Sequence, residues 1–432
     1  MTGTLATVRM RLVPQDPMQR SAVALAVNTG VTSVLGFLYW IVAARFYSPA
    51  VVGASAALIS AMVLMANLAE LNLYNTLIRF LPTAGARSRL YALRAYLAVA
   101  GASVVVALIS LPFLSNIELV REVLGYGPAG VALMVGALLV WTVFALQDSV
   151  AIGARASAWV PVENGVFGVA KLALLVVFAV ALPGSGVFWS WLLAMVPVLV
   201  LMNLLLFGRL LPRHARESAG ASEPVSRSDV AGFMTLDNVA LIGATAANYL
   251  LPIMVVVLVG NEANGYFFVA WGVAAVLDVA LVNVASSLTV EGARQKDRLA
   301  ELAVSLVRRI SLIAVPLVLL VCAAAPLILS LYGEAYVVHS TTMLRVVVLA
   351  VLPRIVIVVW MSLNRVRQRL GRILAVQSVL TCAVLGLSWV FLPTYGIVAI
   401  GVIHLGVQAV VAIVLVPTFR SRSSAGEAAR PA

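Results

Sequence analysis

Charged side chains within long apolar segments are the residues of this chain that could do chemistry. Lys171, Asp278, Arg354 and His404 each lie near the middle of such a segment, and Glu70 lies nearer the end of another. A cation at the centre of a bilayer costs about 2.5–3.5 kcal/mol on insertion scales. Residues of this kind usually face water, a counter-ion or a bound anion. The pattern therefore indicates anion binding or ion transfer inside a membrane.

The sequence contains none of the common catalytic motifs. The chain has no nucleotide-binding loop, no zinc-protease or serine-hydrolase signature and no Cys/His cluster. We therefore predict that it is not an enzyme, that it has no cofactor and that it holds no metal.

Composition dictates the elements that must position these charges. Hydrophobic residues make up 62% of the 432 residues and charged residues only 11%, which is typical of a polytopic membrane protein. A helix that crosses a bilayer needs about 20 mostly apolar residues. The sequence predicts twelve such spans, at 21–44, 51–80, 90–114, 128–150, 159–182, 187–210, 232–259, 264–289, 303–331, 342–363, 371–392 and 395–418.

The distribution of arginines sets the expected orientation. With the N-terminus in the cytoplasm, most of the 29 lysines and arginines fall on the cytoplasmic side, and only Arg45, Arg121 and Arg345 fall outside. We therefore expect a multi-pass protein of the cell inner (cytoplasmic) membrane with both termini in the cytoplasm. The net charge of +12 reflects this topology and contact with anionic lipids, so we expect no nucleic-acid partner.

The predicted spans fall into two sets of six. We expect an N-terminal lobe over 1–210, a polar cytoplasmic linker over 211–229, a C-terminal lobe over 230–418 and a cytoplasmic tail over 419–432. The halves are weakly similar at an offset near 211, which aligns Gly53 with Gly265 and Asn75 with Ser286. Chance matches between apolar helices are common. A true internal repeat would nevertheless suit a transporter.

Polar residues recur at helical spacing near the charges. Asn164, Gly168 and Lys171 share one face of the fifth span, and Asn67 lies one turn before Glu70. The same reasoning marks three further candidates for the wall of a polar cavity, namely Asn75, Asn238 and Thr245.

Each candidate also has a structural explanation. Lys171 could form an ion pair, Arg354 could bond carbonyls freed by Pro353, and Asp278 could serve only as a counter-ion. His404, Asn and Thr could simply join helices through hydrogen bonds. Asp148 and Glu163 lie nearer the cytoplasmic ends of their spans, where snorkelling and helix capping are adequate explanations.

Two stretches resemble a known family. GFLYWIVAARFYSPAVVG, from Gly36 to Gly53, and ELNLYNTLIRFLP, from Glu70 to Pro82, are similar to polysaccharide-biosynthesis flippases of the multidrug/oligosaccharidyl-lipid/polysaccharide (MOP) exporter superfamily. The resemblance implies an all-α, MATE-like fold of two six-helix lobes around a central cavity. It also implies ion-gradient-driven alternating access, with an isoprenoid-pyrophosphate-linked oligosaccharide as cargo.

The resemblance supplies no individual site residues, so the roles are assigned from depth and charge. Lys171 and Arg354 would hold the anionic headgroup, and Asp278, Glu70 and His404 would act as counter-ions or couple transport to H⁺ or Na⁺. We expect membrane lipids as further partners and a monomeric protein. The alternatives are a multidrug and toxin extrusion antiporter, which should have a carboxylate-dominated cavity, and a membrane glycan polymerase or ligase, which should have a large outward loop.

Overall fold

The described part of the chain is built from helices. The computed structural model describes residues 17–70, 72–114, 127–218, 247–294 and 299–419, and every regular element in these ranges is helical. Eleven of the described helical segments are long and apolar enough to cross a membrane. They correspond to eleven of the twelve predicted spans, and the predicted all-α polytopic fold is confirmed. The span predicted at 232–259 is represented by the shorter helix Ala247–Leu258 and otherwise lies outside the described residues.

The helices form two compact units. The N-terminal unit comprises Met1–Tyr47 and Ala61–Ile242, and the C-terminal unit comprises Ser48–Ser60 and Gly243–Ala432. Helix α3 (Pro49–Glu70) therefore contributes its first half to the C-terminal unit and its second half to the N-terminal unit.

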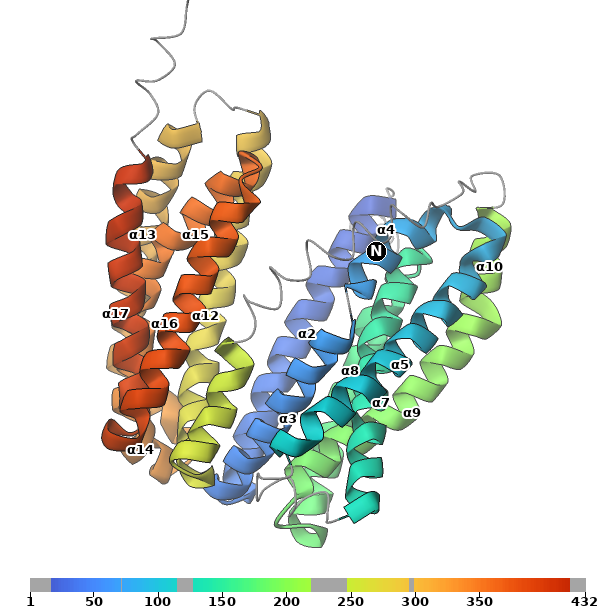
Figure 1. The fold of residues 1–432 in the computed structure, drawn as a ribbon, viewed down its shortest axis with the longest axis horizontal. Coiled ribbons are helices and arrows are strands. Elements are labelled where there is room, and N and C mark those ends of the chain that lie inside the picture. Colours follow the sequence, from blue (N-terminus) through green and yellow to red (C-terminus); the bar gives the residue numbers. More distant parts are fainter. Residues whose placement is uncertain (1–16, 71, 115–126, 219–246, 295–298, 420–432) are drawn as a thin grey trace, which may run out of the picture. The chain divides into compact units, whose positions relative to one another are not determined.

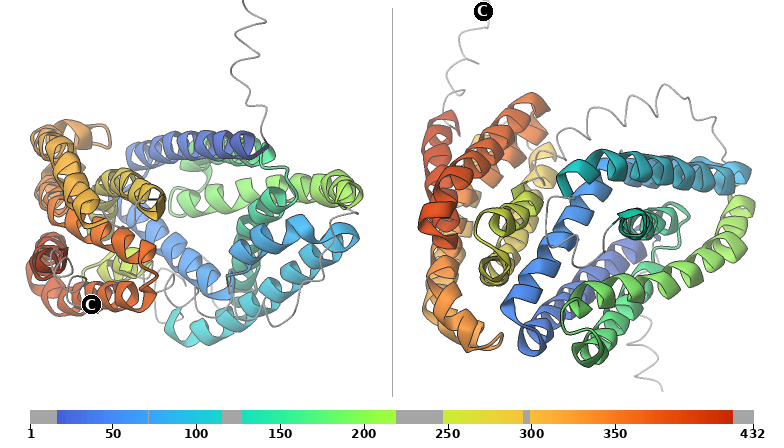
Figure 2. Two further views of the ribbon diagram at one scale, coloured as in Figure 1. Left: turned by 90° about the horizontal axis from the view of Figure 1, so that it is seen from above. Right: turned by 60° about the horizontal axis from the view of Figure 1, so that its bottom comes forward.

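The N-terminal unit is a helical bundle in which α8 packs against α2 and α9, while α7 packs against α4, α5 and α9 (Figures 1 and 2). A core of leucine, valine and alanine side chains joins α4, α5, α7 and the end of α9. Besides α3, its elements are α2 (Pro17–Phe46), α4 (Leu73–Phe80), α5 (Ser88–Leu114), α7 (Gly127–Gly153), α8 (Trp159–Ala181), α9 (Gly186–Leu205) and α10 (Leu211–Glu217).

The C-terminal unit is a second helical bundle (Figure 1). Helix α12 packs against α14 and α15, α13 packs against the same two helices, and α16 packs against α17. Its long elements are α12 (Asn261–Arg294), α13 (Leu299–Ser330), α14 (Glu334–Leu349), α15 (Val351–Val366), α16 (Leu370–Tyr395) and α17 (Ile397–Leu415).

Two predicted spans are interrupted in the structure. The span predicted at 51–80 is divided into α3 and α4, and Asn72 between them has φ 61°. Asparagine tolerates this left-handed conformation better than most residues. The span predicted at 342–363 begins earlier, at Glu334, and is interrupted at Ala350. Pro353 follows this break, and because proline lacks an N–H it cannot complete the helical hydrogen bonds across it.

Two glycines bring α3 and α12 into backbone contact within the C-terminal unit. A Cβ on Gly53 would lie 1.9 Å from the Asn261 carbonyl oxygen, and a Cβ on Gly265 would lie 2.2 Å from the Pro49 oxygen. The buried Asn264 side chain donates a hydrogen bond of 2.6 Å to the Gly53 carbonyl. The two glycines that the weak internal similarity aligns thus form one close helix contact.

This contact predicts a stability difference between two glycine substitutions. Gly53→Ala should destabilise the protein by about 1–3 kcal/mol, because the added methyl collides with backbone that cannot rotate away. Gly36→Ala is the matched control, because nothing lies within 4 Å of its Cβ position. Thermal unfolding in detergent should show a lower midpoint for Gly53→Ala alone. Equal midpoints for the two variants would contradict the close contact.

Candidate functional site

Lys171 is held by aromatic rings. Its ammonium nitrogen lies 4.9 Å from the centroid of the Tyr39 ring and 5.0 Å from that of Phe167. No carboxylate lies within 4.0 Å of it in the ranges that the structure describes, so the ion pair considered from the sequence is not seen there. A cation–π contact contributes about 0.5–2 kcal/mol, so two such contacts offset much of the insertion cost.

Tyr39 is fixed in place beneath the ammonium. It is only 1% exposed, and its hydroxyl donates a hydrogen bond of 2.6 Å to the Val187 carbonyl and lies 3.0 Å from the Ser190 hydroxyl. These bonds join α2 to α9, while Lys171 and Phe167 come from α8. The ammonium has three donors, and no acceptor for them is found among the described residues. Lys171 is therefore a preorganised cation that retains the capacity to bind an anion.

The predicted polar face of α8 is divided between different neighbours. Gly168 packs against α2, since a Cβ there would lie 2.5 Å from Leu35 Cδ1. The Asn164 amide donates to Asp148 on α7 at 3.1 Å and to the Val160 carbonyl at 3.2 Å. Gly168 thus serves helix packing and Asn164 is engaged by a carboxylate, although both recur at helical spacing with Lys171.

Arg354 and Asp278 form a two-bond ion pair in the C-terminal unit. The Arg354 Nε donates to one Asp278 oxygen, and Nη2 donates to the other at 2.9 Å. Because both carboxylate oxygens are engaged, Arg354 on α15 and Asp278 on α12 neutralise each other. This arrangement supports the counter-ion interpretation of Asp278, and the Arg354 side chain bonds this carboxylate rather than the carbonyls near Pro353.

His404 lies beside this ion pair. Its ring makes an edge-on contact with Trp271, with centroids 5.1 Å apart, and it is in electrostatic range of Arg354. Its Nδ1 is buried, and no hydrogen-bond partner for it is found within the described ranges. Helices α12, α15 and α17 thereby bring three of the predicted residues together, and we call Asp278, Arg354 and His404 the C-terminal charge cluster.

The remaining predicted residues belong neither to the Lys171 site nor to the C-terminal charge cluster. Glu70 is the last residue of α3, and its buried Oε1 has no partner among the residues described. Asn67 lies one turn earlier in the same helix and is partly buried. The Asn75 amide donates to Asn72 at 2.7 Å, across the start of α4. Asn238 and Thr245 lie outside the described residues.

Glu163 and Asp148 form hydrogen bonds between helices that the sequence did not predict. Glu163 is only 5% exposed and accepts a hydrogen bond from Gln147, while Asp148 accepts one from Asn164. The expectation that Glu163 snorkels is therefore wrong. One signal was present in the sequence: an amide residue adjoins each acid, and the two pairs flank the short connection between α7 and α8.

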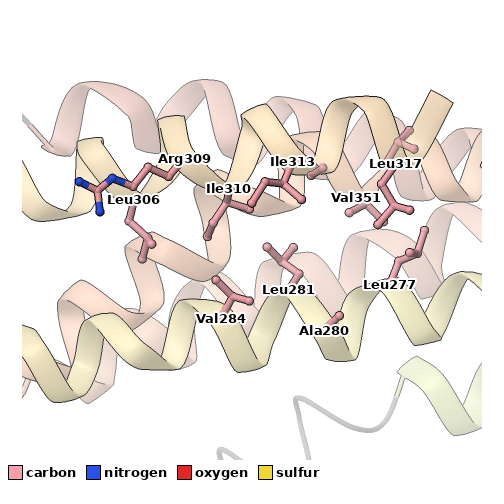
Figure 3. Close-up of a pocket in the computed structure, with 12 residues that line it drawn as sticks. Leu277, Ala280, Leu281, Val284, Leu306, Arg309, Ile310, Ile313, Leu317 and Val351 are labelled. Carbon is pink, nitrogen blue, oxygen red and sulfur yellow. The ribbon is translucent and has the colours of Figure 1, made fainter. Parts of the chain in front are cut away.

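An apolar groove lies along the C-terminal unit. It has a volume of about 320 Å³ and is lined by residues of α12, α13 and α15. In Figure 3, Leu277 and Leu281 on α12 face Ile313 and Leu317 on α13, and Arg309 lies toward one end of the row. The groove can accept part of a hydrocarbon chain, with a cationic group at one end.

Comparison with known proteins shows which fold this is. No family model and no curated protein matches the chain. Among solved structures, an inward-facing multidrug resistance MATE family transporter of the MOP superfamily has a TM-score of 0.66 at 15% identity, with 95% of this chain and 100% of that chain covered. The lipid II flippase MurJ, in an inward closed conformation, has a TM-score of 0.69 at 8% identity, with 92% and 87% covered.

A third solved structure is a MOP superfamily transporter from Pyrococcus furiosus, whose binding pocket is described as having reversed polarity. It has a TM-score of 0.55 at 15% identity, with 96% of this chain and 98% of that chain covered. At such identities the likeness shows the fold alone. The chain therefore has the fold of MOP superfamily transporters, and the structures that it resembles are transporters and a flippase rather than enzymes.

Proposed function

We propose that this protein moves an isoprenoid-pyrophosphate-linked oligosaccharide from the cytoplasmic to the outer leaflet of the cell inner membrane, for cell-surface polysaccharide biosynthesis. The observation that carries the proposal is the Lys171 ammonium, which is held over two rings without a carboxylate partner in the described part of the chain. A pyrophosphate is an anion, and a desolvated ammonium with free donors is a suitable group to bind it.

The apolar groove supports a lipid-linked cargo. Its volume of about 320 Å³ is at the lower end of the range for ligand sites, and its wall is almost entirely aliphatic. Part of an isoprenoid chain could lie along it. A water-soluble sugar would gain nothing from such a surface.

The main alternative is a multidrug and toxin extrusion antiporter, which the shared fold also allows. An exporter of organic cations needs accessible carboxylates, whereas Asp278 is paired with Arg354, and Glu163 is buried. Lys171 would in addition repel a cationic drug. These charges favour an anionic cargo. A membrane glycan polymerase or ligase is disfavoured by the likeness to transporters and a flippase.

We infer that the C-terminal charge cluster participates in an alternating-access cycle driven by H⁺ or Na⁺. A cation that binds Asp278 would weaken its pairing with Arg354 and release a guanidinium that could then attract the cargo. Such an exchange needs no nucleotide and no cofactor. We propose that the protein acts as a monomer in the inner membrane, surrounded by lipid, with both termini in the cytoplasm.

The proposed cargo is tested directly in liposomes. Purified protein should translocate a fluorescent isoprenoid-pyrophosphate glycan without ATP, and Lys171→Ala should slow this at least about tenfold, because the headgroup loses a charged hydrogen-bond donor. Lys171→Arg should retain activity.

The exposed Arg372 supplies the matched control. Arg372→Ala should translocate glycan at the wild-type rate with normal protein abundance. Wild-type translocation by Lys171→Ala would remove Lys171 from the site, and strict ATP dependence would exclude the mechanism.

The Asp278–Arg354 pair predicts an order among charge variants. Asp278→Lys should be more harmful than Asp278→Asn, because it places two cations together instead of leaving one unpaired. Breaking a fully buried pair costs about 3–5 kcal/mol, and this pair is partly buried, so the loss should be smaller. The double exchange Asp278→Arg with Arg354→Asp should recover part of the stability and glycan export. Thermal unfolding and export in cells measure these effects. Equal damage from Asp278→Lys and Asp278→Asn would argue against a charge pair.

A further inference from the structure

Helices α7 and α8 are joined by two crossed amide–carboxylate contacts inside the N-terminal unit. The Gln147 amide on α7 donates to Glu163 Oε1 on α8, and the Asn164 amide on α8 donates to Asp148 Oδ2 on α7 at 3.1 Å. We call these four residues the amide–carboxylate ladder. It is distinct from Lys171 and from the C-terminal charge cluster.

The direction of the hydrogen bonds shows where a proton could be held. Asn203 on α9 donates to Gln147 Oε1 at 2.7 Å, so the Gln147 nitrogen must face Glu163. A Gln147 nitrogen can only donate, which leaves Glu163 Oε1 as an acceptor whether or not the acid is protonated. Oε2, which receives no donor, is therefore the favoured oxygen for a proton on Glu163. By the same reasoning, Oδ1 is the favoured oxygen for a proton on Asp148, because Asn164 donates to Oδ2.

Both of these oxygens are buried and unused. Glu163 Oε2 and Asp148 Oδ1 have no hydrogen-bond partner among the described residues, and Glu163 is 5% exposed. No described lysine, arginine or histidine lies within 4.0 Å of either carboxylate. An ionised carboxylate buried without a cation is strongly disfavoured, and protonation is the usual remedy.

The groups around the ladder further favour the protonated form of the two acids. Tyr96 on α5 is in electrostatic range of both acids, and its buried hydroxyl has no partner in the described ranges. Tyr74 on α4 is in range of Asp148 and of Glu70, a third acid. Asn203 on α9 is neutral. The titratable groups that face the ladder from α3, α4 and α5 are thus acids or phenols, and none supplies positive charge.

We propose that the amide–carboxylate ladder is a proton-binding site, in which Asp148 and Glu163 together hold about one proton, and that this proton contributes to driving transport alongside the cation exchange at the C-terminal charge cluster. One proton relieves the repulsion between the two acids while leaving one negative charge to attract it. The proton comes from water, adds to a carboxylate lone pair and returns to water on release, so no other reactant is needed. The coupling half of this proposal rests on the proposed function, whereas proton binding does not.

A metal ion fits this site less well than a proton does. Metal ions such as Mg²⁺ and Ca²⁺ need several converging oxygen ligands. Here each carboxylate already accepts an amide through one oxygen. No group of three His, Cys, Asp or Glu side chains arranged to hold a metal is found in the described part of the chain.

The test is the infrared absorbance of protonated carboxyl groups, measured on the full-length protein in lipid nanodiscs as the pH is lowered. Above the pH range in which exposed carboxyls take up protons, the ladder should contribute about one protonated carboxyl per chain to the band of the wild-type protein. The double variant Asp148→Asn with Glu163→Gln should lose this band, because no protonatable oxygen remains in the ladder. Glu262→Gln is the control, because Glu262 is an exposed carboxylate on α12, and it should retain the band.

The outcomes distinguish the proton site, the coupling ion and the proposed cargo from one another. An unchanged band in the double variant would overturn the proton site. A band that disappears when Na⁺ is added at constant pH would overturn the proton as the coupling ion. If the double variant does not fold, Glu163→Gln alone should shift the appearance of the band to lower pH, because Asp148 no longer has a neighbouring charge that favours proton uptake. An intact band without any glycan translocation would refute the proposed cargo and leave the proton site standing.

Discussion

Hydrocarbon does not stabilise an isolated charge, so each ionisable side chain within a span must be compensated where it lies. This protein uses three different means. Lys171 lies over the rings of Tyr39 and Phe167, Arg354 pairs with Asp278 through two hydrogen bonds, and Asp148 and Glu163 accept neutral amides. Each of these arrangements joins side chains from two or more helices of one unit.

The three ways of compensating a charge leave the side chains able to do different chemistry. Aromatic rings screen an ammonium but do not use its hydrogen-bond donors, so Lys171 can still bind an anion. The carboxylate of Asp278 uses both its oxygens, so the ion pair can act only when it is broken. The amides use one oxygen of each acid and leave the other able to take a proton. Anion binding, charge release and proton binding thus follow from how each charge is compensated.

Helix α8 carries two of these capacities. Glu163 and Lys171 lie eight residues apart on it, which corresponds to a rise of about 12 Å along the axis. In a medium of low dielectric constant, charges at this separation still interact appreciably. Proton binding at the ladder would therefore change the electrostatic field at Lys171 without any direct contact. This gives a physical route by which a proton could alter the binding of an anionic headgroup.

The sequence predicted the helices better than their interactions. Hydropathy located eleven of the spans because a membrane helix must satisfy all of its backbone groups internally. It could not show the break at Asn72, which depends on a left-handed backbone conformation rather than on polarity. The sequence showed that Lys171 lies deep in a span. It could not show the contact with Tyr39, because Tyr39 lies on α2, which is far from α8 in the sequence although the two helices pack together. Glu163 was misjudged because nearness to a helix end was taken as exposure, whereas Glu163 is buried and bonded by Gln147 on α7.

The central claim is that the Lys171 ammonium is free to hold an anionic lipid headgroup. Native mass spectrometry of the intact protein with an isoprenyl pyrophosphate and the corresponding neutral isoprenyl alcohol tests it most directly. Wild-type protein should prefer the pyrophosphate, and Lys171→Gln should lose about tenfold or more of that preference while binding the alcohol equally well. Lys171→Arg should retain the preference. An undiminished preference for the pyrophosphate in Lys171→Gln would contradict the claim.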